Sequence, residues 1–167
     1  MAAAPIPRPS ARILLVSRDG RVLLFSSQLS DHPGRTGWFT PGGGVRDGEA
    51  LAAAAARELA EETGQAIPED ALGPVVAVCS GEWAAGDRVF AATDSYFFAR
   101  AATLAVDTSG HEELERSVIT GHRWWSADEI DETADLVLPS GLAGLLRQLL
   151  SEGPPAAPVR LPWHDAG

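Results

Sequence analysis

The chain has 167 residues, which is enough for one domain but short for two. Its 13 basic and 23 acidic residues give a formal net charge of −10, which argues against a general binder of nucleic acid polymers or anionic membranes. All the basic residues are arginines, which excludes lysine-dependent phosphate loops and Schiff-base chemistry. The single Cys79 excludes an internal disulfide, and no apolar run reaches the roughly 18 residues of a membrane span.

The two ends of the chain differ in composition from its middle. Residues 1–10 are rich in alanine and proline, and residues 153–167 begin Gly-Pro-Pro-Ala-Ala-Pro. We therefore expect a flexible N-terminal segment over 1–10, one folded domain over 11–152, and a proline-rich tail over 153–167 without regular elements. The start resembles no secretion signal, so we expect a cytoplasmic protein.

Short apolar runs bounded by turn residues predict the strands of a mixed sheet. We expect strands at residues 13–16, 22–25, 38–40, 75–78, 89–99 and 118–125. The first two flank an Asp-Gly pair and are predicted to form a hairpin. Residues 26–37 are predicted to form a loop, and residues 81–87 a turn.

Three segments predict helices. Residues 49–63 contain many strong helix formers and are followed by Gly64, which suits the position after a helix end. Ser126 and Glu129 have the spacing of a capping box that begins a short helix. Leucines at i, i+3, i+4, i+7 and i+8 from Leu142 predict a final amphipathic helix. Helices on the faces of a mixed sheet indicate an α/β layered domain.

The predicted helix over 49–63 carries an unusual group of carboxylates. Glu58, Glu61 and Glu62 stand at i, i+3 and i+4, so they share one face with their Cβ atoms about 5–6 Å apart. Like charges this close repel one another, and Arg57 supplies a single compensating charge. The oxygen-rich face suits Mg²⁺ or Mn²⁺, although a triplet of glutamates alone is also typical of a solvated helix face.

Two further features support a ligand site at this helix. Leu51, Ala55 and Leu59 lie on a different face, which can pack against the sheet. The glycines 42–44 lie just before the helix, where their backbone can approach a metal or a phosphate closely.

The full spacing of these residues is more specific than the triplet. Gly43 is followed after five residues by Glu49, then after seven by Arg57-Glu58-Leu59, then by the pair at 61–62 and by Gly64. This pattern resembles the Nudix box, with seven fixed residues matched. The one departure is Gln65, where the family usually has an aliphatic residue that packs. The flanking residues, Trp38 to Gly44 and Arg123 to Trp125, are also similar to the family, so the resemblance extends over residues 11–150.

The resemblance implies a Nudix-type α/β/α sandwich with a mixed sheet and a loop–helix–loop catalytic box. It further implies a pyrophosphohydrolase that cleaves a nucleoside diphosphate linked to another group X, by attack of water on phosphorus. The implied cofactor is Mg²⁺ or Mn²⁺, and the implied partners are a small nucleotide-type substrate and a second copy of the chain in a homodimer.

The resemblance also assigns roles within the box. Glu58, Glu61 and Glu62 are implied to hold the metal, together with the backbone carbonyl of Gly43. Glu58, Glu61 and Arg57 are the implied catalytic residues. Glu49 and Arg57 are expected to hold each other and to orient the helix.

Substrate contacts are less directly encoded. Without lysine, arginine must bind the phosphates, and the candidates are Arg46, Arg88 and Arg123. Trp83 lies in a turn-like glycine-flanked segment where a large aromatic ring has no core to fill, so we expect it to stack on a base.

Mg²⁺ takes six ligands, more than one helix face supplies. The resemblance implies that a loop facing the box provides a further glutamate. Residues 111–115 form the acidic loop at a plausible place, and we expect Glu115, at the start of the following strand, to be this metal ligand, with Glu112 as the second choice. A solvated acidic loop is the alternative.

A non-catalytic module that binds a nucleotide or nucleotide sugar on the same fold is the alternative function. Such modules tend to lose box carboxylates or to carry a DNA-binding domain. This chain has every box carboxylate and little length for a second domain, so hydrolysis is the function that the sequence favours.

Overall fold

Strands supply the frame of the molecule, which the computed structural model describes over residues 3–30 and 32–163, apart from the side chains at 114 and 115. The strands in this part of the chain are β1 (Ile6–Val16), β2 (Val22–Gln28), β3 (Thr36–Phe39), β4 (Gly42–Gly44), β5 (Ala77–Ala85), β6 (Arg88–Arg100), β7 (Ile119–Trp125), β8 (Leu136–Val137) and β9 (Val159–Leu161). The helices are α1 (Leu51–Thr63), the 3₁₀ helix η1 (Glu69–Ala71), α2 (Glu113–Val118), α3 (Ala127–Glu132) and α4 (Leu142–Glu152).

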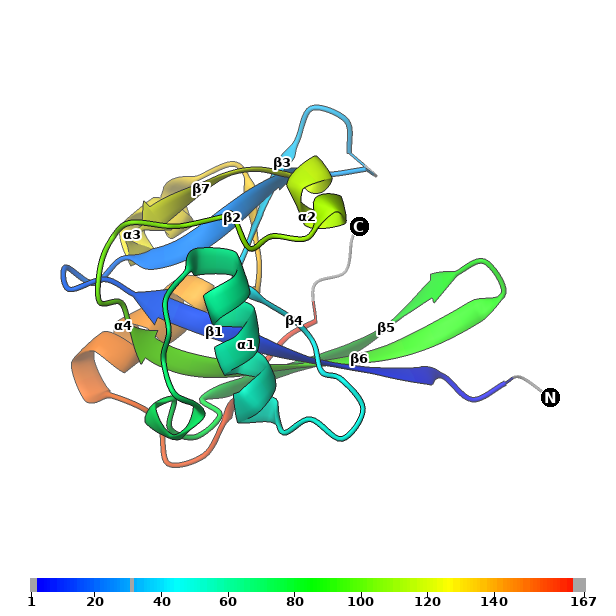
Figure 1. The fold of residues 1–167 in the computed structure, drawn as a ribbon. Coiled ribbons are helices and arrows are strands. Elements are labelled where there is room, and N and C mark those ends of the chain that lie inside the picture. The colour runs from blue at the N-terminus through cyan, green and yellow to red at the C-terminus, as the bar shows by residue number, and fades with distance from the viewer. Residues whose placement is uncertain (1–2, 31, 164–167) are drawn as a thin grey trace.

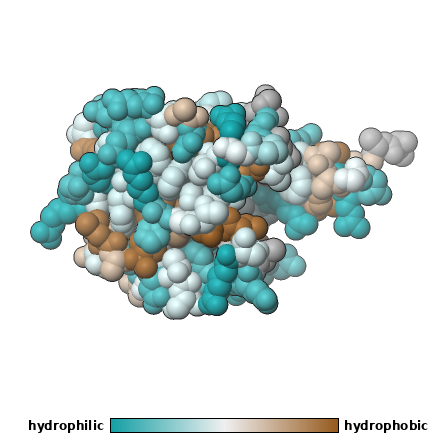
Figure 2. Space-filling view, turned by 90° about the horizontal axis from the view of Figure 1, so that it is seen from above, coloured by the Kyte–Doolittle hydropathy of each residue, from teal (hydrophilic) through white to brown (hydrophobic). Residues whose placement is uncertain are grey.

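The described strands form one mixed sheet with β1 at its centre. The order is β8-β3-β2-β1-β6-β5-β9, with β4 paired to β1 and β7 paired to β2. Strand β1 runs parallel to β6 from Ile6 opposite Phe90 to Val16 opposite Arg100, and antiparallel to β2 and β4. The far ends of β1, β5 and β6 extend beyond the body as an arm (Figures 1 and 2).

Alternation along β1 separates the core into two layers. Ile13 and Leu15 face α1, where they pack with Ala55 and Leu59, whereas Leu14 faces the side covered by α3 and α4. The four leucines of α4 that are buried in this second layer are Leu142, Leu145, Leu146 and Leu149. A sheet between two helical layers confirms the expected α/β/α sandwich, and on the face seen in Figure 2 apolar residues are confined to patches.

Both ends of the chain contain strands, contrary to expectation. Strand β1 begins at Ile6, inside the segment predicted to be flexible, and β9 lies in the predicted tail and pairs in parallel with β5. The prolines of the first segment fit a strand because Pro9 turns its backbone away from β6, and its carbonyl accepts from Val45 N on that side at 3.0 Å. The N–H that Pro9 lacks would not have pointed at β6, so its absence removes no hydrogen bond between β1 and β6.

Long-range pairing also shifts several internal boundaries. The predicted loop over 26–37 is shorter, because β2 continues to Gln28 and pairs with Thr36 of β3. The predicted turn over 81–87 is mostly strand, and the hairpin turns at residues 86–87. The acidic loop expected before the strand at 118–125 contains helix α2, and β7 starts at Ile119.

Local signals in the sequence predicted the helix ends well. Gly64 ends α1 in the left-handed conformation at φ 76°, and Ser126 and Glu129 form both hydrogen bonds of the capping box of α3. Helix α1 begins at Leu51 rather than at residue 49. Leu51 was predicted to pack against the sheet, but its side chain is exposed.

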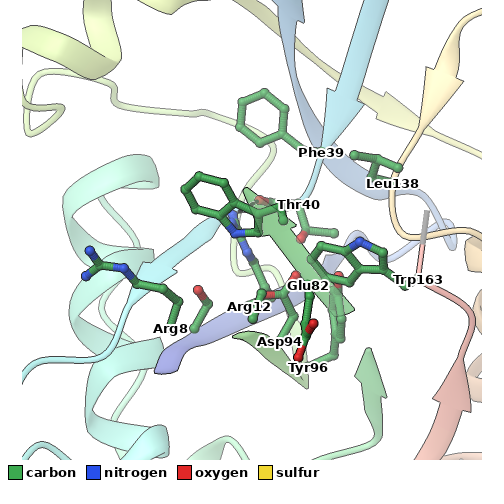
Figure 3. Close-up of a pocket in the computed structure, with 12 residues that line it drawn as sticks. Arg8, Arg12, Phe39, Thr40, Glu82, Asp94, Tyr96, Leu138 and Trp163 are labelled. Carbon is green, nitrogen blue, oxygen red and sulfur yellow. Dashed lines mark hydrogen bonds between the residues drawn. The ribbon is translucent and has the colours of Figure 1, made fainter. Parts of the chain in front are cut away.

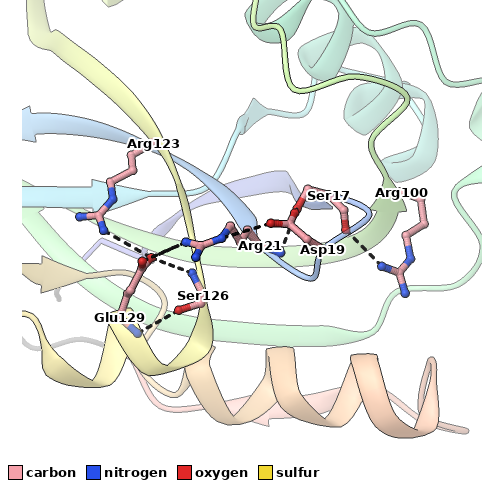
Figure 4. A network of polar contacts seen from close by, with 7 residues as sticks. All are labelled: Ser17, Asp19, Arg21, Arg100, Arg123, Ser126 and Glu129. Atoms are coloured by element: carbon pink, nitrogen blue, oxygen red, sulfur yellow. Dashed lines mark hydrogen bonds and ion pairs between the residues drawn. The ribbon is translucent and has the colours of Figure 1, made fainter.

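Glu129 also joins α3 to the β1–β2 hairpin (Figure 4). Both of its carboxylate oxygens accept from Arg21 Nη1, at 2.9 and 2.8 Å, and Arg123 lies 3.3 Å away. The hydrogen bonds from Arg21 hold the pKa of Glu129 below its usual value. None of the described helices combines the length and the apolar character that a membrane crossing needs.

Candidate active site

The glycine strand β4 lies against both helix α1 and strand β1. The Gly42 N–H donates to the Glu62 carboxylate at 2.8 Å, and a Cβ on Gly42 would collide with the backbone of Ala11. A Cβ on Gly43 would lie 2.6 Å from Glu58 Oε1. Glycine is therefore required at both positions because the backbone approaches its neighbours too closely for a side chain, and Gly42 also has a φ of +140°.

Arg57 organises the carboxylates around this strand. It makes a two-point contact with Glu49, from Nε and Nη2 at 2.9 Å each. Its Nη1 donates to Glu58 at 2.8 Å and lies 3.6 Å from Glu61, while Nη2 reaches the Gly44 carbonyl at 3.1 Å. The predicted pairing of Glu49 with Arg57 is confirmed, and it connects the loop before α1 to the middle of the helix.

These contacts perturb the acidity of both partners. The hydrogen bonds from Arg57, followed by one from the Arg46 backbone N–H, lower the pKa of Glu49 from 4.5 to about 2. The same pairing with Glu49 and Glu58 raises the pKa of Arg57 above its usual value. Glu49 therefore stays ionised well into acid, and Arg57 is permanently charged.

The three glutamates of the helix differ in exposure and direction. Glu58 and Glu62 are buried, at 7% and 4% exposure, whereas the side chain of Glu61 is 36% exposed. Over residues 3–30 and 32–163, no three acidic, histidine or cysteine side chains converge as a metal site would require. The expected cluster is not assembled, because Arg57 attracts Glu58 and Glu61 while the Gly42 N–H holds Glu62.

A pocket of about 640 Å³ adjoins the glycine strand (Figure 3). Arg12 connects the two, since its Nη1 donates to the carbonyl oxygens of Thr40 and Gly42 at 3.3 Å each. The lining residues come from β1, β3, β5 and β6, from the positions just after β3 and β8, and from the C-terminal segment. They are Arg8, Ser10, Arg12, Phe39, Thr40, Glu82, Trp83, Ala92, Asp94, Tyr96, Leu138 and Trp163.

Known proteins share both the sequence pattern and the fold of this chain. The family model described as the NUDIX domain matches residues 6–148. The chain belongs to the NUDIX family. Two curated relatives are RNA pyrophosphohydrolases, from Novosphingobium aromaticivorans with 46% identity over 59 residues and from Caulobacter vibrioides with 47% over 60 residues. These matches cover 35% and 36% of this chain and 35% and 34% of the relatives, so they span about a third of each relative's length.

Solved structures agree with the family on the fold. The MutT protein of Methanosarcina mazei has a TM-score of 0.61 at 20% identity, over 87% of this chain and 94% of its own. The NUDIX domain of Shewanella oneidensis NrtR, solved as a complex with ADP ribose, has a TM-score of 0.58 at 19% identity, over 89% and 90% of the two chains. At these identities the likeness concerns the fold alone.

The departure from the Nudix box at Gln65 has a structural explanation. Gln65 is buried, as the packing position requires, and its amide has polar partners from the loop after β6. Its Nε2 donates to the Thr103 carbonyl at 3.0 Å, and its Oε1 accepts from the Ala102 N–H at 3.1 Å. The side chain therefore connects that loop to the end of helix α1, the Nudix helix, instead of filling an apolar site.

The structure distributes the predicted substrate residues over different regions. Trp83 lines the pocket, but it lies in strand β5 and stacks on Phe90 with ring centroids 4.4 Å apart, rather than standing in a turn. Arg46 is exposed in the loop before the Nudix helix, and Arg88 is exposed at the start of β6. Arg123 lies over the Trp125 ring at 4.1 Å and pairs with Glu129, and it is not among the pocket's lining residues.

The candidates for a further metal ligand lie around α2. The backbone of Glu115 belongs to α2 rather than to a strand start, and its side chain lies outside the described residues. Glu112 is exposed just before this helix. The same region contributes His111, whose Nε2 lies 2.8 Å from the Glu62 carbonyl, so it does contact the Nudix helix.

Sequence reasoning missed most of the pocket. Arg8, Ser10 and Arg12 alternate along β1, and Asp94 and Tyr96 alternate along β6, opposite Ser10 and Arg12. Polar residues at every second position are a signal for a solvated sheet face, and β1 carries that signal, whereas in β6 Asp94 stands between the polar Thr93 and Ser95. Trp163 carried no such signal, because it lies within the segment over 153–167 that was predicted to be a tail.

We predict that Glu49→Gln destabilises the protein at neutral pH and that the difference from wild type disappears in acid. The folded pKa of Glu49 lies near 2 and its ordinary value is 4.5. Its contribution is therefore present above pH 4.5 and is lost as the pH falls towards 2. Urea unfolding at pH 7, 5 and 3 measures this difference, with Glu152→Gln at the exposed end of α4 as the control. A gap between wild type and Glu49→Gln that does not narrow with acid contradicts the assignment.

We also predict that Gly43→Ala costs about 1–3 kcal/mol of stability. The new Cβ lies 2.6 Å from Glu58 Oε1, so the carboxylate must move away from Arg57. Gly44→Ala is the matched control, since a Cβ there meets nothing within 4 Å. Denaturant unfolding of both variants tests the prediction, and equal stabilities would show that the close approach at Gly43 carries no constraint.

Proposed function

We propose that the protein is a metal-dependent pyrophosphohydrolase that cleaves a nucleoside diphosphate linked to another group X. The observation that carries the proposal is the Nudix box with all of its charged residues, folded with Glu62 against a glycine strand that Arg12 connects to a pocket. Membership of the NUDIX family and the name of the curated relatives support the same reaction class.

The residues present fit a hard divalent cation such as Mg²⁺ or Mn²⁺. Three carboxylates, those of Glu49, Glu58 and Glu61, share the single guanidinium of Arg57, and Glu62 adds a fourth carboxylate on the same helix beside Gly42. Glu58, Glu61, Glu62 and the Gly43 carbonyl offer the oxygen donors that such cations prefer, and Glu115 stays a predicted further ligand. When bound, the cation would withdraw charge from the phosphoryl oxygens and acidify a water molecule.

The chain's own groups account for the remaining steps. One of the helix carboxylates accepts a proton from a water molecule while the oxygen of that water forms a bond to phosphorus. The bridging P–O bond of the pyrophosphate breaks at the same centre, and the leaving phosphate departs with the bond's electron pair. Arg57 keeps Glu58 in place and connects it to Glu49, so the carboxylates hold their orientation during the reaction.

Recognition of the substrate is assigned to the region around the pocket. We propose that the nucleoside enters the pocket beside Trp83, and that Arg46, Arg88 and Arg123 remain candidates for phosphate contacts. Arg46 is placed best of the three, because its loop joins β4 to the Nudix helix. A cytoplasmic location and a homodimer stay predictions from the sequence.

A substrate panel with Mg²⁺, scored by product mass, tests the proposal. It contains nucleoside triphosphates, ADP ribose, nucleotide sugars and a short RNA with a 5′-triphosphate, because the curated relatives are named for RNA and one structural neighbour was solved with ADP ribose. Cleavage at a pyrophosphate bond supports the proposal. Tight binding without turnover of any member would instead support the non-catalytic nucleotide-binding module.

We predict that chelation with EDTA abolishes turnover and that added Mg²⁺ or Mn²⁺ restores it. Glu61→Gln and Glu62→Gln each remove one ligand charge without changing side-chain size, and we expect kcat to fall about 10²-fold or more. Steady-state kinetics at saturating Mg²⁺ measure the loss, and Glu152→Gln serves as the control. Near-wild-type kcat in both variants, or full activity after rigorous chelation, rejects the metal assignment.

A further inference from the structure

The Asp94 carboxylate in the pocket has no hydrogen-bond or ion-pair partner among the residues that the structure describes. Asp94 lies on β6 between Ala92 and the buried Tyr96, and it is half-buried. Its register neighbours are Ser10 on β1 and Cys79 on β5, neither of which is charged. Throughout residues 3–30 and 32–163, no hydrogen bond or ion pair engages the Asp94 carboxylate. A half-buried acceptor of this kind is available to a ligand.

Aromatic rings follow this carboxylate along strands β5 and β6. The ring of Trp163 lies directly over Gly81, where a Cβ would overlap it, so the glycine makes room for the indole. Trp83 stacks on Phe90 farther along the same two strands. Figure 3 shows Asp94 and Tyr96 together on the sheet, with Trp163 brought to the pocket by the C-terminal segment. Flat walls of this kind suit a planar heterocycle that stacks.

The chemistry of a carboxylate restricts which heterocycle fits. An ionised Asp accepts hydrogen bonds and donates none, and its two oxygens suit two adjacent N–H donors. Guanine presents such a pair, N1–H and the N2 amine, on one edge. Adenine and cytosine place an acceptor nitrogen beside their amine, and uracil has one N–H between two carbonyls. Each of these bases would direct a lone pair at the carboxylate.

The position of the pocket and a comparison with its other carboxylate, Glu82, also favour Asp94 as the group that recognises the base. Arg12, which faces Tyr96 across the β1–β6 pair, donates from Nη1 to the Thr40 and Gly42 carbonyls, so the pocket is continuous with the glycine strand of the box. Glu82 also borders the pocket but is exposed. A base held at Asp94 would share the pocket with Arg12, the residue that connects the pocket to Gly42 of the glycine strand.

We propose that Asp94 makes this protein selective for guanine-type nucleotides, with the base stacked beside Trp163. The proposal rests on the proposed function for the reaction, but base recognition can be measured without it. Its substrate class is a guanine nucleotide carrying a pyrophosphate. The C-terminal segment that supplies Trp163 lies beyond residues 6–148, the range that the family model matches.

Equilibrium binding tests the proposal in the absence of metal and turnover. The probes are guanosine, inosine and adenosine 5′-monophosphates, followed by quenching of the tryptophan fluorescence of the full chain. We expect the wild type to bind the guanosine compound about tenfold or more tightly than the adenosine compound. Inosine, which lacks the N2 amine, should fall between them. Affinities for guanosine and adenosine compounds within twofold, or no binding of any of the three, overturn the proposal.

Two variants of similar size localise the effect. Asp94→Asn replaces one acceptor by a donor and so matches adenine, and we expect the guanosine-to-adenosine affinity ratio to fall at least tenfold. Glu82→Gln should leave that ratio unchanged. Circular dichroism checks that both variants fold. If one of them does not fold, the binding of the three monophosphates to the wild type still tests the selectivity. A ratio that is unaffected by Asp94→Asn, or one that shifts with Glu82→Gln instead, overturns the assignment to Asp94.

Turnover of GTP and ATP with Mg²⁺ separates this proposal from the hydrolase proposal. Selective guanosine binding without hydrolysis of any nucleotide leaves Asp94 as the reading group and removes the catalytic function. Hydrolysis with equal kcat/KM for GTP and ATP, and equal binding of the monophosphates, leaves the catalytic function and removes the role of Asp94.

Discussion

The absence of side chains on strand β4 is the constraint on which the site depends. Gly42 uses both of its backbone polar groups across this strand, because its N–H donates to Glu62 and its carbonyl accepts from Arg12. This one residue therefore contacts the acidic helix through its N–H and Arg12 of the pocket wall through its carbonyl. A Cβ at Gly42 would collide with the backbone of β1, and one at Gly43 would displace the Glu58 carboxylate, so a side chain at either position would disturb the contact between the helix and the central strand.

The acidic residues of α1 are tolerated because the packed residues beside them on the helix hold it firmly. Ala54, Ala55 and Leu59 are fully buried against the sheet, and small alanines allow the helix to approach closely. Arg57 touches three carboxylates with one positive charge, so it offsets only part of their mutual repulsion. Such an excess lowers the stability of the isolated helix and is useful where positive charge must be attracted.

The sequence predicted those parts of the site that lie close together along the chain. Glu49, Arg57 and Glu58 belong to one helix and its lead-in, so helical periodicity and a family spacing were sufficient to relate them. The pocket could not be predicted in this way, because Arg12 and Asp94 come from strands that are distant in the chain and meet by parallel pairing. Trp83 was expected in a turn, since its glycine neighbours signal a turn and only the β5–β6 register shows otherwise.

The C-terminal segment over residues 153–163 helps to form the pocket but lies outside the Nudix box. This segment adds β9 to the sheet edge and brings an indole to the pocket, but it contributes nothing to the Nudix box. Mutations there can reshape the pocket wall while the acidic helix and its glycine strand stay intact. Evolution can therefore change what such a protein recognises by revising the end of its gene, independently of the residues that perform the chemistry.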